Sequence, residues 1–203
     1  MISTEAIPEP KLMQLKVMYW GCGEAGKTTN FERLQEIFAD YKISHGFSIA
    51  TTDERTLWND SVHFKFSLAS FNLDVIVNVA TTTGQERFLS TREYVLQNAD
   101  GVIFVADSSL DKIDNNLRSF EELKSFIHRD NIPILIQLNK RDLDDAIKED
   151  KFRRIMRLPL AQKDSLGFRI VYPAIAIDKR ELHNVKRIFI DMIQKILRQK
   201  LTI

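Results

Sequence analysis

Short apolar runs alternate with longer amphipathic stretches along this chain of 203 residues. The runs are rich in Val, Ile, Leu and Phe, as β-strands commonly are. Helical periodicity fills most of the gaps between them, for example from Lys27 towards Ala39. Such alternation predicts βαβ units, and hence a mostly parallel sheet with helices on both faces. The six runs lie at residues 15–20, 62–69, 73–79, 101–106, 132–138 and 168–172.

Two neighbouring runs, residues 62–69 and 73–79, are separated by too few residues for a crossover helix. We therefore expect them to form an antiparallel hairpin at one edge of the sheet. The predicted fold class is α/β, with a six-stranded, mostly parallel sheet and one antiparallel edge strand.

The last stretch of the chain has an apolar stripe at helical spacing and basic residues off the stripe. This pattern predicts a helix that packs on the core. A helix that lies on a membrane surface with its basic face is the alternative, although basic residues near a helix C-terminus also suit the helix dipole. The stripe is Val185, Ile188, Phe189, Met192, Ile193 and Ile196, and the basic residues are Lys186, Arg187, Lys195 and Arg198.

The composition indicates how many domains the chain forms and in which cellular compartment it works. A hydrophobic content of 44% is enough for one buried core, so we expect a short flexible arm at residues 1–10 and a single domain at residues 11–203. The single cysteine, Cys22, cannot form an internal disulfide, and no signal peptide opens the chain, so a cytoplasmic location is expected. No apolar run approaches the length of a membrane-spanning helix.

Charge and histidine placement exclude two further classes of site. Lys and Arg number 29 against 28 Asp and Glu, so no overall field favours nucleic acid. The histidines, at positions 45, 63, 128 and 183, lack the spacing of zinc ligands.

The segment "GCGEAGKTT" follows the first predicted strand and precedes a predicted helix, and it matches the phosphate-binding pattern G-x-x-x-x-G-K-[ST]. Its backbone N–H groups can surround phosphate oxygens, while Lys27 bridges the outer phosphates and the Thr28 hydroxyl binds Mg²⁺. A nucleoside triphosphate with Mg²⁺ is the predicted ligand. The expected nucleotide contacts are Gly21, Gly23, Glu24, Ala25, Gly26, Lys27, Thr28 and Thr29.

The tetrapeptide "NKRD", Asn139 to Asp142, follows the fifth predicted strand. Ligands of open α/β sheets bind beyond the carboxyl ends of the strands, so this segment should share an edge with the phosphate loop. A carboxylate such as Asp142 can accept both hydrogens that guanine offers at N1 and N2, and the Lys140 stem can cover the ring. The predicted base is guanine.

With these motifs the sequence resembles the small Ras-like GTPases, and most closely their MglA-type members in bacteria and archaea. The segments "GKTTN", "DERTL", "GQ", "VIFVADSS" and "IQLNKRDL" carry the resemblance, which covers nearly the whole chain from Leu15. It implies a Ras-like P-loop fold, GTP or GDP with Mg²⁺, and slow GTP hydrolysis in a molecular switch. It also implies that Ala176 donates its N–H to guanine, although Ile175 stands where the family usually has serine.

The resemblance assigns further roles to two loops. Thr56 aligns with the threonine that completes Mg²⁺ coordination, with Thr51 and Thr52 as competing candidates. Arg55 resembles an intrinsic arginine finger, and the alternative is an ordinary solvated arginine. Gln85 resembles the glutamine that orients the attacking water, and Gly84 the residue whose N–H contacts the γ-phosphate.

Thr81 stands where the usual D-x-x-G motif has aspartate, which holds a Mg²⁺-bound water. A hydroxyl can accept that hydrogen bond with less electrostatic help. MglA-type proteins share this threonine. The resemblance therefore implies that the threonine is a mark of this subgroup and does not exclude catalysis.

The expected partners are guanine nucleotide, a roadblock/LC7-type activator similar to MglB, and an effector that reads the switch loops. Two other functions stay open on the sequence: a guanine-nucleotide-binding scaffold that does not hydrolyse GTP, and another P-loop enzyme such as a nucleotide kinase or transport ATPase. The "NKRD" segment and the glutamine loop argue against the second.

Overall fold

A seven-stranded mixed sheet forms the centre of the molecule, in the order β2-β3-β4-β1-β5-β6-β7. The structure is a computed structural model that describes residues 9–43, 61–82, 96–127 and 132–201. Its strands are β1 Lys11–Trp20, β2 Lys42–Ile43, β3 Ser61–Leu68, β4 Leu73–Thr81, β5 Gly101–Asp107, β6 Ile134–Asn139 and β7 Val171–Pro173. Its α-helices are α1 Lys27–Ile37, α3 Ile113–Phe126, α4 Glu149–Ile155 and α5 His183–Leu201. Three 3₁₀ turns are η1 Ala39–Tyr41, η2 Ala69–Phe71 and η4 Leu110–Lys112.

The strand directions confirm the predicted α/β class. β4, β1, β5, β6 and β7 run parallel, and β3 is antiparallel to β4 in the expected hairpin. The predicted count of six strands was one too low, because β2 pairs with β3 outside the hairpin. With only two residues, β2 is too short to show any alternation of apolar and polar positions.

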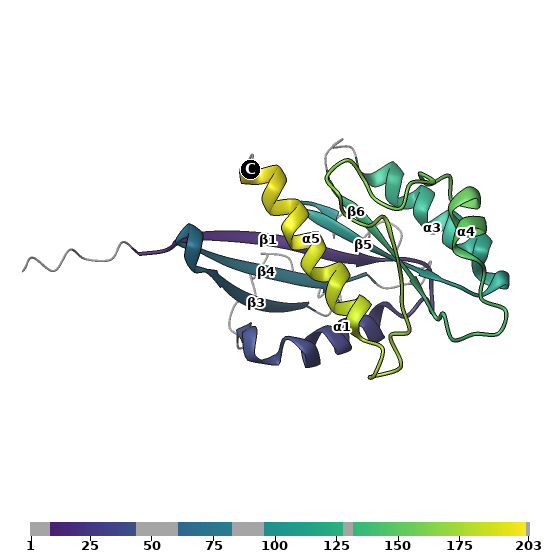
Figure 1. Cartoon of the computed structure of the whole chain (residues 1–203), viewed down its shortest axis with the longest axis horizontal. Helices are drawn as coiled ribbons and strands as arrows, with labels where there is room; N and C mark the ends of the chain where they lie inside the picture. The colour runs from purple at the N-terminus through teal and green to yellow at the C-terminus, as the bar shows by residue number, and fades with distance from the viewer. Residues whose placement is uncertain (1–8, 44–60, 83–95, 128–131, 202–203) are drawn as a thin grey trace, which may run out of the picture.

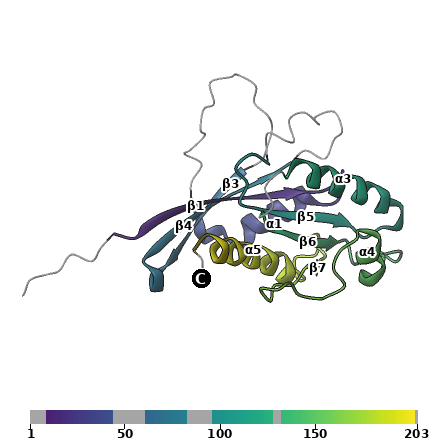
Figure 2. The same cartoon turned by 90° about the horizontal axis from the view of Figure 1, so that it is seen from above.

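Helices cover both faces of the sheet, as Figures 1 and 2 show for α5 on one side and α3 on the other. Alternate residues of β1 pack against the helices on the two faces of the sheet, since successive side chains of a strand point to opposite faces. Val17 and Tyr19 pack in the cluster under α1 and α5, whereas Met18 and Trp20 pack in the cluster under α3 and α4. The central strands are therefore apolar on both faces.

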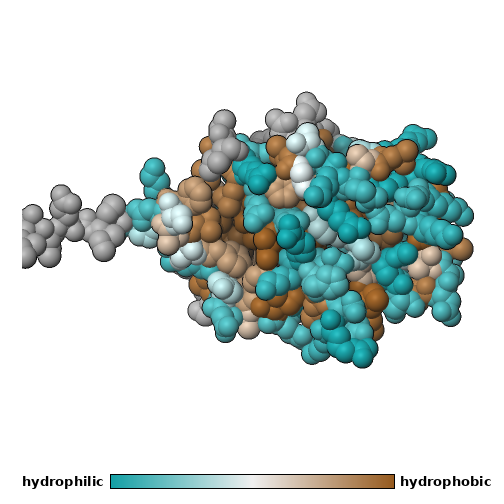
Figure 3. Space-filling model, viewed as in Figure 1, coloured by the Kyte–Doolittle hydropathy of each residue, from teal (hydrophilic) through white to brown (hydrophobic). Residues whose placement is uncertain are grey.

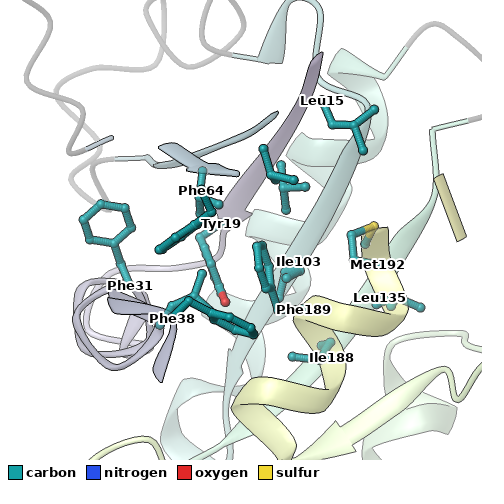
Figure 4. Close-up of a cluster of buried hydrophobic side chains, with 14 of the residues drawn as sticks. Leu15, Tyr19, Phe31, Phe38, Phe64, Ile103, Leu135, Ile188, Phe189 and Met192 are labelled. Carbon is teal, nitrogen blue, oxygen red and sulfur yellow. The ribbon is translucent and has the colours of Figure 1, made fainter. Parts of the chain in front are cut away.

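The core under α1 and α5 is rich in aromatic rings (Figure 4). Phe38, just beyond α1, and Phe189 of α5 lie with ring centroids 5.3 Å apart, and both contact Phe64 of β3. Tilted and edge-on aromatic pairs of this kind add to the free energy of burial. The buried face of α5 confirms that the apolar stripe at the chain end packs on the core: Val185, Ile188, Phe189, Met192 and Ile196 are all buried.

An apolar area remains on the outer parts of β1, β3 and β4, which extend beyond α5 (Figures 1 and 3). Met13, Phe66 and Leu68 are only partly buried there against the α1/α5 core. None of the helices in the described ranges is long and apolar enough to cross a membrane.

Candidate nucleotide-binding site

The carboxyl ends of the parallel strands meet at one edge of the sheet, where the predicted site residues gather. β1 ends at Trp20 before the phosphate loop, and β4 ends at Thr81. β5 ends at Asp107 and β6 ends at Asn139, the first residue of "NKRD". Residues far apart in the sequence thus share one rim, as the order of strands and helices predicts.

Close backbone packing explains the glycines of the phosphate loop. A Cβ on Gly21, whose φ is +150°, would lie 2.1 Å from the carbonyl oxygen of Val105. A Cβ on Gly26, at φ +95°, would lie 2.4 Å from Nδ2 of Asn139. Only glycine fits at either position, and both adopt backbone angles that side chains disfavour.

The interior of the loop is suited to an anion. No backbone carbonyl of the described residues accepts a hydrogen bond from the N–H groups of Glu24 or Gly26. Helix α1 begins at Lys27 with no acidic residue in its first turn, so its N-terminal partial charge is uncompensated there. Lys27 is buried, and its Nζ donates to the carbonyl oxygens of Gly21, at 2.9 Å, and Cys22, at 2.6 Å.

Thr28 and Thr29 lie in the first turn of α1, and Thr28 is exposed. A hydroxyl at this position is a suitable oxygen ligand for Mg²⁺ in combination with phosphate oxygens. The part of the chain that the structure describes holds no cluster of three or more His, Cys, Asp or Glu side chains that could bind a metal ion.

Asn139 connects the phosphate loop to the loop that follows β7. Its Nδ2 donates to the carbonyl oxygen of Ala25 at 3.0 Å, and its Oδ1 accepts from the N–H of Ala176 at 3.0 Å. The side chain is almost fully buried. The N–H group expected to contact guanine thus points at this site but binds Asn139 in the structure, so a guanine oxygen would have to share or replace that acceptor.

Lys140 and Asp142 extend from the same turn at the sheet edge. Lys140 has a left-handed backbone, with φ +60°, and its Nζ lies 2.7 Å from Oδ2 of Asp107. Asp142 is exposed and so is accessible to a ligand. Neighbouring Arg141 secures the turn, because its N–H donates to the carbonyl oxygen of Ala174 and its guanidinium to that of Ile147.

Asp107 is a fully buried carboxylate that the sequence motifs did not single out. Burial raises its pKa, but hydrogen bonds from Lys140 and Ser109 outweigh this effect, and the pKa lies below its ordinary value. The side chain therefore stays ionised at neutral pH and fixes the Lys140 ammonium.

Cys22 is enclosed rather than presented to solvent. Its Sγ donates to Oδ1 of Asn116, a buried residue of α3, at 3.4 Å. Asn116 in turn binds both the N–H and the carbonyl oxygen of Asp107. Burial raises the pKa of the thiol above its ordinary value, against the opposing influence of Lys27. Cys22 is therefore a buried structural thiol, although a thiol near a helix N-terminus is often reactive.

Thr81 lies at the end of β4, beside Tyr19 of β1, and is buried. The next residue, Thr82, donates from both its N–H and its hydroxyl to the carbonyl oxygen of Tyr19. This places the position that usually carries aspartate next to the strand that leads into the phosphate loop. Six other predicted residues lie outside the described ranges: Thr51, Thr52, Arg55, Thr56, Gly84 and Gln85.

Comparison with known proteins agrees with this geometry. A profile of the ADP-ribosylation factor family matches residues 7–192. The chain belongs to this family. It is 31% identical to the mutual gliding-motility protein MglA of Myxococcus xanthus over 70% of this chain and 74% of that protein. It is also 24% identical to ADP-ribosylation factor-like protein 14 of Mus musculus, over 73% of this chain and 70% of that protein.

Membership of the ADP-ribosylation factor family confirms the predicted Ras-like GTPase fold and function. The chain is a small GTPase of the GTP/GDP switch class, and guanine nucleotide is its ligand. Sequence motifs did not reveal the buried polar contacts behind the site, at Asn30, Asp107, Asn116 and Gln137. The available signal was a polar residue at an apolar position of a predicted strand or helix, as at Gln137 in "ILIQLN".

Proposed function

We propose that this chain is a guanine-nucleotide switch that hydrolyses GTP slowly by itself, and that its single G domain spans residues 11–203. The observation that best supports the proposal is the joint placement of the phosphate loop and "NKRD", because Asn139 contacts both Ala25 and Ala176. One side chain thereby links the phosphate end of the site to the base end.

The phosphate end is formed by the loop from Gly21 to Thr29. The N–H groups of Gly23, Glu24, Ala25 and Gly26 surround the phosphates, and Lys27 turns its ammonium from the loop carbonyls towards the outer phosphate oxygens. Thr28 and Thr56 would hold Mg²⁺, which when bound would neutralise charge on the nucleotide phosphates. Thr81 would offer a neutral hydroxyl to a water bound to that metal.

The base end distinguishes guanine from adenine. Asp142 accepts hydrogen bonds from N1 and N2 of guanine, the Lys140 stem covers the ring, and the Ala176 N–H faces O6. Adenine offers an acceptor at N1 and no amino group at C2, so it would leave the carboxylate without donors. Asp142→Asn should therefore exchange guanine preference for xanthine preference, because an amide can donate to the O2 of xanthine.

Hydrolysis requires a positioned water and positive charge near the transferring phosphoryl group. Gln85 orients the water, Gly84 contacts the γ-phosphate, and Arg55 supplies the charge as an intrinsic finger. Without an activator the rate should be on the order of 10⁻⁴ to 10⁻² per second. We further propose a roadblock/LC7-type, MglB-like activator, an effector that reads the switch loops, and a cytoplasmic location.

The test begins with the nucleotide that accompanies the purified protein. We expect guanine nucleotide, and we expect slow phosphate release from added GTP and Mg²⁺ that falls further in Gln85→Leu. Unchanged turnover in Gln85→Leu would contradict the role of that glutamine. If bound GTP persists unhydrolysed for hours, even after Thr81→Asp, the non-hydrolysing scaffold is the better description.

A further inference from the structure

Buried amide groups link strand β6 to the phosphate loop at a second point, beside Asn139. Gln137 lies two residues before Asn139, so both side chains leave the strand on the same face. Nε2 of Gln137 donates to Oδ1 of Asn30 on α1, and Nδ2 of Asn30 donates to the carbonyl oxygen of Gly26 at 2.8 Å. Gln137 and Asn30 are both fully buried.

Two consecutive carbonyl groups of the loop are thus tied to one strand. Asn139 binds the oxygen of Ala25, and Gln137 reaches the oxygen of Gly26 through Asn30. The oxygen of one residue and the N–H of the next belong to the same rigid peptide plane. Fixing these two oxygens therefore fixes the directions of the Gly26 and Lys27 N–H groups, which belong to the phosphate-binding loop.

Fold stability alone does not account for this pair of amides. Their surroundings are apolar: Val105 of β5, which pairs with Gln137 in the sheet, and Leu135, two residues before it on β6, both belong to the buried core under α1 and α5. Oε1 of Gln137 is also buried and accepts no hydrogen bond from any described residue. A buried acceptor without a partner is destabilising, whereas two apolar side chains of similar shape would fill the space without that cost.

We propose that Gln137 and Asn30 are positioning residues that set how long guanine nucleotide stays bound. They act as a relay from the guanine-binding strand to the phosphate loop, and keep Gly26 and Lys27 oriented for the phosphates. Release of nucleotide requires these N–H groups to turn away, so the relay slows release. This inference rests on the proposed function.

The experiment measures dissociation of fluorescent GDP, with Mg²⁺ present, from the full chain and three variants. Gln137→Met and Asn30→Leu keep the side-chain shape and remove the amide, and the third variant combines them. Each single variant should release GDP about tenfold faster, equivalent to about 1.4 kcal/mol. The double variant should match the faster single variant rather than multiply the two effects, because both changes break one relay.

Two further variants separate positioning from stability. The exchange Asn30→Gln with Gln137→Asn retains both amides and the summed side-chain length, and it should restore slow release. Leu34→Val, one turn further along α1, removes a buried methylene without touching the relay, and it should lower the melting temperature while release stays slow. The apolar double variant should do the reverse, with fast release and an undiminished melting temperature.

The outcomes distinguish the relay from the proposed function. If the unmodified chain retains no guanine nucleotide, the proposed function itself is wrong. If it retains GDP and the amide variants release it at the same rate, only the relay is contradicted. A release rate that follows the melting temperature across all variants, Leu34→Val included, would also overturn the positioning role.

Discussion

At the scale of single residues, Cys22 shows how enclosure changes the chemistry of a motif position. A thiol near a helix N-terminus often has a low pKa. Here the side chain is 6% exposed and burial raises its pKa. We expect alkylation by iodoacetamide at pH 7.5 to be at least tenfold slower in the folded chain than in the same chain in denaturant, a rough figure based on thiolate supply and access. Mass spectrometry of timed samples measures the alkylation rate. Equal rates in the folded and the denatured chain would contradict the burial of Cys22.

Asp107 provides a second prediction at this scale, because its carboxylate holds the Lys140 ammonium. Asp107→Asn keeps an acceptor for Ser109 but removes the charge opposite Lys140. Since Lys140 is one third exposed, we expect a moderate effect, with GDP release about fivefold faster by stopped-flow fluorescence. The matched control is Asp74→Asn, which removes a carboxylate paired with Lys65 at the opposite end of the sheet and should leave release unchanged.

The pH dependence of this contact follows from the lowered pKa of Asp107. A group whose pKa is lower in the folded state stabilises that state above its unfolded pKa, and the contribution is lost as the pH falls through the folded pKa. The Asp107–Lys140 pair is thus intact at neutral pH and weakens only below about pH 4. The difference in release rate between Asp107→Asn and the unmodified chain should therefore be constant from about pH 6 to pH 8.

At the scale of elements, a buried hydrogen bond fixes α5 against β7. The Tyr172 hydroxyl donates to Oδ2 of Asp191 at 2.7 Å, and Arg187 binds the same carboxylate oxygen. Hydrogen bonds to charged groups contribute about 1.5 to 3 kcal/mol. Tyr172→Phe should lower the free energy of unfolding by about 2 kcal/mol, measured by urea denaturation monitored with circular dichroism. Tyr41→Phe, which changes a half-exposed ring, is the control, and an equal loss in both variants would contradict the role of the Tyr172 bond.

The order and type of the helices and strands could be predicted from the sequence, because the spacing of apolar residues depends only on near neighbours in the chain. The residues at which the elements begin and end were harder to predict. β1 begins at Lys11 rather than near Leu15, since its first residues pair with β4 across 62 positions of sequence. The final strand was expected at residues 168–172 but spans Val171–Pro173. Phe168 is instead buried outside the strand, beneath the Arg198 guanidinium.

The sequence predicts the phosphate loop of the site but not the side-chain contacts behind it. Gly21, Gly26 and Lys27 form a contiguous motif, so their spacing alone indicates a phosphate loop. The contacts of Asn30 with Gln137, and of Cys22 with Asn116, join residues about 100 positions apart. No pattern within one sequence encodes such pairings, because they exist only once the strands are ordered. The roles of Arg55, Thr56, Gly84 and Gln85 stay predictions.

At the scale of the whole molecule, both ends of the site must act together for nucleotide to stabilise the fold. A ligand that binds only the folded state raises its stability by about 2.7 kcal/mol at one hundred times its dissociation constant. For a domain of this size we expect GDP with Mg²⁺ to raise the melting temperature by about 5 to 10 °C. Calorimetry on nucleotide-free protein at saturating GDP measures the shift.

Comparison of ligands makes this last prediction specific to the site. ADP offers the same phosphates to the loop from Gly21 to Thr29 but lacks donors for Asp142, so its shift should be much smaller than that of GDP. Inorganic pyrophosphate tests the phosphate end alone and should give a shift similar to that of ADP. Equal shifts for GDP and ADP would show that the phosphate loop works without guanine recognition by "NKRD". The Asn139 contacts would then hold the two loops together without making them one binding site.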